Sequence, residues 1–162
     1  EMAFKNAIEN GSAILSFTNH DFRDMSVDIN DIYTRIHCIA KNYSNVEIVN
    51  SSAVNAMQKD LFRDEDVKKN RVKLTSKIIQ KENVSKVVVT CENGDVFGSQ
   101  PYLAIKTKEG KYYHDNFNEK DYPKSWEYIF DRSTMALSTI DKLCIAANDK
   151  YGNQSIVFND LN

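Results

Sequence analysis

The sequence predicts a mixed α+β fold, in which a short α/β segment is followed by an antiparallel β module. Before residue 65, apolar residues recur mainly at spacings of three and four, which is typical of helices, and two short apolar runs separate these stretches. After residue 70, apolar and polar residues alternate, and turn-forming residues recur at regular intervals. We therefore expect two parts, residues 1–62 and residues 70–162, joined by a solvated charged stretch of mixed sign.

Composition narrows the classes of partner. The net charge is −2, and lysines alternate with acidic residues instead of forming a basic face, so we expect no nucleic-acid partner. No apolar run approaches the roughly 20 residues that span a bilayer, so no membrane span is expected either. The opening residues do not have the pattern of a signal peptide.

The three cysteines, Cys38, Cys91 and Cys144, form no C-x-x-C pair. Three unpaired thiols favour a reducing compartment such as the cytoplasm. A Cys91–Cys144 bridge between two strands of the β module is the alternative.

The first part is expected to alternate helices with short strands. In chain order, we expect a helix that ends at Gly11, a strand over 13–18, a helix over about 27–43 capped by Ser26, a strand over 46–49 and a helix capped by Ser51 or Ser52. This order contains a βαβ unit, which normally places two parallel strands side by side. Two strands are too few for a stable sheet, so they need further strands from elsewhere.

The run from Ala13 to Asp21 and the run from Asn45 to Val54 carry a resemblance to a known family. The first run reads AILSFTNHD and is followed by the amphipathic helix; the second reads NVEIVNSSAV. Together they resemble the end of a polysaccharide deacetylase domain, over about residues 3–60. The family has Leu two positions before its histidine, and this chain has Thr18 there. The resemblance implies a fragment of an α/β barrel in a bacterial carbohydrate-processing protein, with the missing N-terminal part of the same chain as its structural partner.

The resemblance also implies a catalytic role for His20. In the family, the corresponding histidine is the general acid toward the leaving amine, and Asp21 or Asp24 would tune the pKa of His20. The implied reaction is metal-assisted removal of an acetyl group from a glycan, with a zinc-type divalent metal. The family's metal-binding motifs are absent from this sequence, so we expect no metal site or other cofactor here, and no hydrolysis by this chain alone. The alternative is that His20 bonds to loop backbone and that Asp21, Arg23 and Asp24 form a loop ion pair or cap the next helix.

The second part is expected to hold about seven strands. They are expected near 72–79, 84–90, 102–107, 112–114, 126–130, 143–147 and 154–158, with hairpin turns at the Asn93-Gly94 pair and at residues 108–111. The run from Ala146 to Ser155 resembles the last hairpin of bacterial immunoglobulin-like and fibronectin-like modules. In that hairpin, Asp149 can accept bonds from downstream amides, and Gly152 can adopt positive φ. The β module is therefore expected to be an immunoglobulin-like β-sandwich.

Aromatic and amide side chains in this module suggest a sugar site, because rings stack on apolar sugar faces and amides bond hydroxyls. The candidate ligand-binding residues are Gln100, Tyr113, His114, Asp115 and Asn116. Trp126 is interpreted as a core residue, as is common in sandwiches.

Two functions follow from these patterns. The first is the C-terminal fragment of a deacetylase-like carbohydrate-processing protein, with the sandwich as an accessory domain and a glycan as substrate. The second is a non-catalytic module that binds a glycan or a protein.

Overall fold

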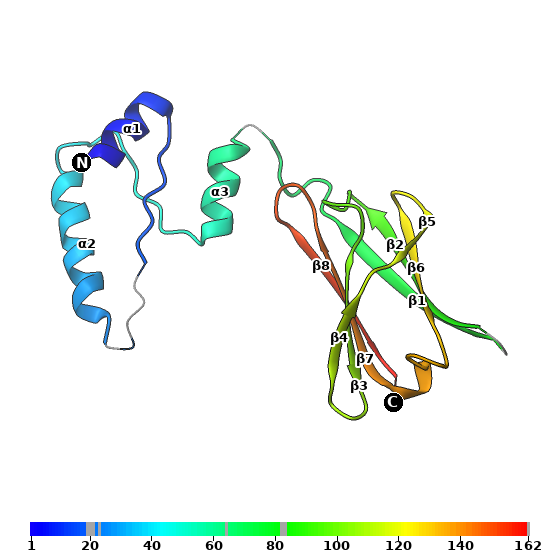
Figure 1. The fold of residues 1–162 in the computed structure, drawn as a ribbon. Helices are drawn as coiled ribbons and strands as arrows, with labels where there is room; N and C mark the ends of the chain where they lie inside the picture. The colour runs from blue at the N-terminus through cyan, green and yellow to red at the C-terminus, as the bar shows by residue number, and fades with distance from the viewer. Residues whose placement is uncertain (19–21, 23, 64, 82–83, 162) are drawn as a thin grey trace. The chain divides into compact units, whose positions relative to one another are not determined.

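The computed structural model describes residues 1–18, 22, 24–63, 65–81 and 84–161. It contains both helices and antiparallel sheets, so the prediction of a mixed α+β fold is confirmed (Figure 1). The chain divides into two compact units, Glu1–Asp64 and Glu65–Asn162. We call them the helical unit and the β unit.

In the part of the helical unit that the structure describes there are three helices: α1 (Met2–Asn10), α2 (Ser26–Ala40) and α3 (Ala53–Leu61). Helix α1 ends at Gly11, whose φ of 80° is in the left-handed region that favours glycine. The Ser52 side chain accepts a hydrogen bond from the Asn55 amide at 3.3 Å and so caps α3. The end of α1 and the start of α3 therefore agree with the predictions, whereas α2 ends three residues earlier than expected.

The prediction of two strands in the helical unit is wrong for the described residues. Neither residues 13–18 nor residues 46–49 form a strand, and no β-ladder joins them in the part of the chain that the structure describes. Most of their apolar side chains stay exposed, with Leu15 at 62% and Val49 at 53%. An extended segment with no ladder partner cannot satisfy its backbone groups as a strand does.

Among its described residues, the β unit contains eight strands in two four-stranded antiparallel sheets. Sheet A has the order β1-β2-β6-β5 and sheet B the order β4-β3-β7-β8. The strands are β1 (Lys73–Lys81), β2 (Val84–Asn93), β3 (Tyr102–Thr107), β4 (Tyr112–Asp115), β5 (Asn118–Asp121), β6 (Ser125–Phe130), β7 (Ile140–Asn148) and β8 (Gln154–Asp160).

Both sheets contribute to one hydrophobic core. Val87 and Val89 of β2 and Leu103 and Ile105 of β3 are fully buried in it. Trp126 is 1% exposed, and its Nε1 donates to the Ser99 carbonyl at 3.0 Å, so its interpretation as a core residue is confirmed. Side chains alternate along each strand, and the residues between the core residues therefore form the outer face of each sheet.

The Asn93-Gly94 pair does not close a hairpin. It lies between β2 of sheet A and β3 of sheet B, which do not pair, so the chain changes sheets here. Gly94 has a φ of 66°, the positive value that a tight turn at an Asn-Gly pair requires. This turn, however, leads the chain from sheet A to sheet B and does not join two paired strands. By contrast, the predicted hairpin at 108–111 joins the paired strands β3 and β4. The fully exposed strand β5 was not expected, because its sequence NEKD has no apolar residue.

Asp149 organises the turn between β7 and β8. Its buried carboxylate accepts hydrogen bonds from the amides of Tyr151 and Asn153, both at 3.0 Å, which confirms the predicted turn. The same turn holds residues that were expected to be a solvated connector. The Tyr151 hydroxyl donates to Glu65, and Asn153 Nδ2 donates to the Val67 carbonyl at 2.6 Å. Residues 65–67 therefore belong to the β unit.

All three cysteines are free thiols. Cys38 is exposed, whereas Cys91 of β2 and Cys144 of β7 lie in different sheets. The alternative of a Cys91–Cys144 bridge is therefore wrong.

Candidate functional site

Of the three predicted catalytic residues, His20 and Asp21 lie outside the described residues. Asp24 lies just before α2, and its carboxylate accepts hydrogen bonds from the Ser26 amide and the Ser26 hydroxyl, both at 2.9 Å. These bonds lower the pKa of Asp24 below its ordinary value, the backbone bond most of all. Asp24 thus holds the first turn of α2, whereas Ser26 was expected to cap it.

Three of the predicted ligand-binding residues form one polar cluster where β4 ends. Gln100 Nε2 donates to Asn116 Oδ1 at 2.8 Å, and Gln100 Oε1 accepts from the Phe117 amide at 2.6 Å. Asp115 Oδ1 accepts from the Asn116 amide at 2.8 Å. Both ends of the Gln100 amide are therefore used within the protein. The cluster fastens the loop before β3 to the end of β4.

Asp115 also joins the two sheets. Its Oδ2 accepts a hydrogen bond from the Tyr128 hydroxyl of β6 at 3.0 Å. Burial, with a further contribution from the bond to Asp115, raises the pKa of Tyr128 to about 12. The neutral phenol is therefore the form that the fold stabilises.

Tyr113 and His114 do not share a site. In the register of β3 and β4, Tyr113 lies opposite the core residue Ile105, whereas His114 lies opposite Ala104 on the outer face. Consecutive strand residues point to opposite faces of a sheet. Tyr113 and His114 therefore point to opposite faces of sheet B, and their role in binding a sugar stays a prediction.

Tyr113 lines a cleft of about 460 Å³. The β3–β4 hairpin contributes Thr107 and Lys108, and the segment before β7 contributes Met135 and Thr139. The Thr139 hydroxyl donates to the Ala136 carbonyl at 2.7 Å, and Thr107 Oγ1 accepts from the Lys111 amide at 3.2 Å. These hydroxyls hold the cleft walls in place.

His114 lies on a different surface, which sequence reasoning missed. Large exposed side chains gather on the outer face of sheet B, from three strands: Tyr102, Tyr112, His114, Ile156 and Phe158. We call this surface the apolar outer face. The Tyr102 and His114 rings stack with their centroids 6.1 Å apart. The alternation of residues along β3, β4 and β8 contained the signal, because Tyr102, Tyr112, Ile156 and Phe158 occupy outward positions where polar residues are usual.

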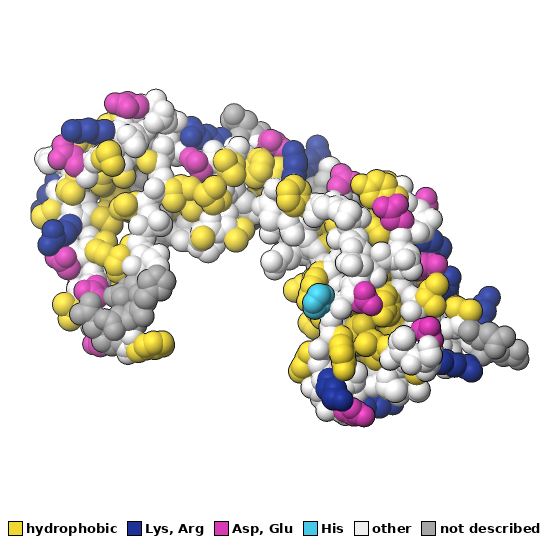
Figure 2. Space-filling view, in the orientation of Figure 1, with side chains coloured by type: hydrophobic (Ala, Val, Ile, Leu, Met, Phe, Trp, Pro, Cys, Tyr) yellow, Lys and Arg dark blue, Asp and Glu magenta, His cyan; other side chains and the backbone are white. Residues whose placement is uncertain are grey.

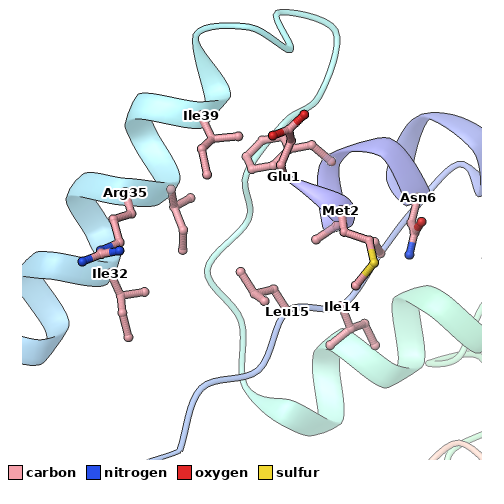
Figure 3. A pocket seen from close by; sticks show the side chains of 12 residues that line it. Glu1, Met2, Asn6, Ile14, Leu15, Ile32, Arg35 and Ile39 are labelled. Carbon is pink, nitrogen blue, oxygen red and sulfur yellow. The ribbon is translucent and has the colours of Figure 1, made fainter.

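An apolar hollow lies within the helical unit. It has a volume of about 380 Å³ and lies between α1, the extended segment 13–15 and α2 (Figure 3). Met2, Leu15, Ile32 and Ile39 point toward it (Figure 3). Because Phe4 is the one buried residue among the described side chains of this unit, the helices leave most of their apolar surface uncovered.

The described residues bring no three histidine, cysteine, aspartate or glutamate side chains together as a metal site. No helix among them is long and apolar enough to cross a membrane. Comparison with protein-family models, with curated proteins and with solved structures finds no match for this chain.

Proposed function

We propose that residues 1–60 are the last part of a polysaccharide-deacetylase-like barrel domain, and that the β unit is an immunoglobulin-like accessory sandwich of the same carbohydrate-processing protein. One observation carries this proposal. The helical unit exposes apolar side chains along two unpaired extended segments, including Ile14 at 43%, Leu15 at 62% and Val49 at 53%. Isolated segments of this kind are expected where a sheet is incomplete.

The amphipathic helix α2 supports the same proposal. Ile32, Ile36 and Ile39 lie on one face and line the apolar hollow, although none of them is buried. A helix that covers a complete sheet would bury such a stripe. Further strands of a barrel would cover both the stripe and the extended segments.

The proposed reaction is hydrolysis of an N-acetyl group on a glycan. The oxygen of a water molecule bonds to the acetyl carbon and its protons pass to the solvent, the C–N bond breaks, and acetate and a free amine leave. His20 supplies the proton that the departing nitrogen takes up. The described residues do not fit the divalent metal that the family resemblance implies, since no three ligand side chains among them come together.

The test uses the protein that contains this chain together with its upstream residues. Acetate release from N-acetylated chitohexaose is measured for wild type, His20→Ala and His37→Ala. His20→Ala should lower kcat about 100-fold or more, because a general acid contributes at least that much. His37 is the matched control: it is exposed on α2, and its Nδ1 bonds to the Tyr33 carbonyl at 2.8 Å. Equal rates for all three proteins would show that His20 is not the general acid. The absence of acetate release by the wild-type protein would show that the proposed reaction does not occur.

A second candidate is a non-catalytic binding module. The observation that favours it is the apolar outer face, since large exposed apolar patches usually mark interaction sites. In this case the chain would bind its partner with the same affinity whether or not His20 is present, and no acetate would be released.

A further inference from the structure

We propose that the apolar outer face of sheet B binds a neutral glycan chain. The choice of a glycan as occupant rests on the proposed function, but binding here does not require catalysis. Of the ligand-binding residues expected from the sequence, His114 belongs to this face, whereas the Gln100–Asn116 pair is used for internal hydrogen bonds and Tyr113 lies on the other side of the sheet.

The exposure of this face sets it apart within the β unit. Tyr102 is 58% exposed, Tyr112 75%, Ile156 51% and Phe158 68%. Figure 2 shows hydrophobic side chains (yellow) at the surface of the β unit. The outer face of sheet A, by comparison, exposes Ile129 at 47% but has no aromatic side chain among its described residues, and it carries Lys77 and an ion pair between Lys86 and Glu127 with an N–O distance of 2.7 Å. An aromatic outer surface is therefore a property of sheet B and not of both sheets.

The strand register arranges these side chains in rows. His114, Ala104, Cys144 and Phe158 lie side by side across four strands, and Tyr102, Ala146 and Ile156 form the adjacent row. Four neighbouring strands span about 14 Å at the usual strand spacing. Small residues occupy the middle of the rows and large ones the outside, so an extended chain can lie across the middle with rings on either side.

The charges around the apolar outer face indicate which class of ligand it can bind. The two lysines that border the face on β3 and β7 are neutralised by carboxylates: Lys106 bonds to Asp141 at 2.7 Å, and Lys142 to Asp160 at 2.9 Å. The face therefore offers no free cation of β3 or β7 for a phosphate or sulfate. A neutral ligand with apolar faces complements this surface, whereas a polyanion does not.

The polar atoms of the rings favour a sugar. The hydroxyls of Tyr102 and Tyr112 and the ring nitrogens of His114 make no hydrogen bond to any other residue that the structure describes. Each ring thus pairs an apolar surface with a free polar group. Pyranose rings present the complementary combination of C–H faces and hydroxyls, which stack on aromatic rings and bond their polar atoms.

The experiment uses the 162-residue chain labelled with ¹⁵N and titrated with N-acetylated chitohexaose. We expect amide shifts confined to β3, β4, β7 and β8, and saturable binding by calorimetry. Tyr102→Ala and Phe158→Ala should each weaken binding about tenfold, which is the usual effect of removing an aromatic anchor. Phe97→Ala is the matched control, because Phe97 is 67% exposed in the same unit but lies in the loop before β3. Unchanged amide shifts in sheet A show that each variant is folded.

Several outcomes would overturn the inference. These are the absence of binding, equal affinity in Phe158→Ala and Phe97→Ala, and tighter binding of a heparin hexasaccharide than of chitohexaose. Self-association that Phe158→Ala abolishes would show that a second copy occupies the face. The proposed function is tested by a different result. If the longer protein releases no acetate but this chain still binds chitohexaose at the apolar outer face, the proposed function is wrong and the inference of glycan binding holds.

Discussion

Tyr128 is the residue at which chemistry and stability are most directly linked. Its hydroxyl joins sheet A to Asp115 at the end of β4, and burial holds it neutral. The pKa of Tyr128 rises from an ordinary value of 10.0 to about 12 in the folded protein. The folded state therefore retains this proton at pH values where the unfolded chain has lost it.

This difference predicts a loss of stability in alkali. The stabilisation from neutral Tyr128 is fully present below pH 10.0, and it is lost as the pH rises from 10.0 toward about 12. Urea unfolding of the 162-residue chain at a series of pH values measures the slope. Tyr128→Phe keeps the ring but has no proton to lose, so its free energy of unfolding should fall less steeply over this range. The same slope in both proteins would contradict the assignment.

At the scale of elements, the turn after β2 shows how one residue, Gly94, determines the path of the chain between β2 and β3. A Cβ added at Gly94 would lie 2.4 Å from the Asn70 carbonyl oxygen and 2.8 Å from the Val72 nitrogen. Both are backbone atoms of the segment that leads into β1, so they cannot rotate away. Gly94 therefore combines a positive φ with a close approach of two chain segments.

Gly94→Ala and Gly110→Ala form a matched pair. Gly110 has a φ of 81°, but an added Cβ there has no atom within 4 Å. Gly110→Ala should cost about 1 kcal/mol from backbone conformation alone. Gly94→Ala should cost about 3 kcal/mol or more, because overpacking adds to the same backbone term. Thermal or urea unfolding of the two variants checks this order, and equal costs would show that the segment before β1 can move aside.

The whole molecule consists of two units of very different packing. The β unit has a core of fully buried side chains from both sheets, including Trp126, Leu103 and Ile145. In the helical unit, Phe4 is the one buried residue among the described side chains. Since buried apolar area is the main source of stability, the two units should not be equally stable.

We expect amide hydrogen exchange to separate the units. Amides of α1, α2 and α3 should exchange at least about 100-fold faster than those of β2, β3 and β7, because local opening is easiest where few apolar contacts are broken. Exchange of the 162-residue chain, followed by NMR, measures this ratio residue by residue. Comparable protection of α2 and β7 would mean that the helical unit is stable by itself, and the proposal that it needs further strands would lose its support.

Several predictions from the sequence were confirmed because they depend on a few neighbouring residues. Gly11 ends α1, Ser52 caps α3, and Asp149 accepts bonds from its own downstream amides. The limits of β3, at Tyr102 and Thr107, also follow from alternation within one segment. Even the separation of Tyr113 from His114 was contained in that alternation, since adjacent strand residues face opposite ways.

Other features depend on distant partners and could not be predicted. The Asn93-Gly94 turn resembles a hairpin locally, but β2 pairs with β1 and β6, so the chain crosses to the other sheet. Strand β5 has no apolar side chain and forms because its backbone pairs with the neighbouring strand β6. Conversely, residues 13–18 have the composition of a strand, yet they have no ladder partner among the described residues.

By itself, the sequence determined where α1 ends and where α3 begins, which strand residues share a face, and that the chain combines α and β parts. The tertiary structure alone decided which strands pair, and that Tyr102, His114 and Phe158 meet on one outer face. The physical reason is range. Turns, caps and side-chain alternation are set by steric and hydrogen-bonding preferences over a few residues, whereas pairing and burial depend on the packing of segments that are far apart along the chain.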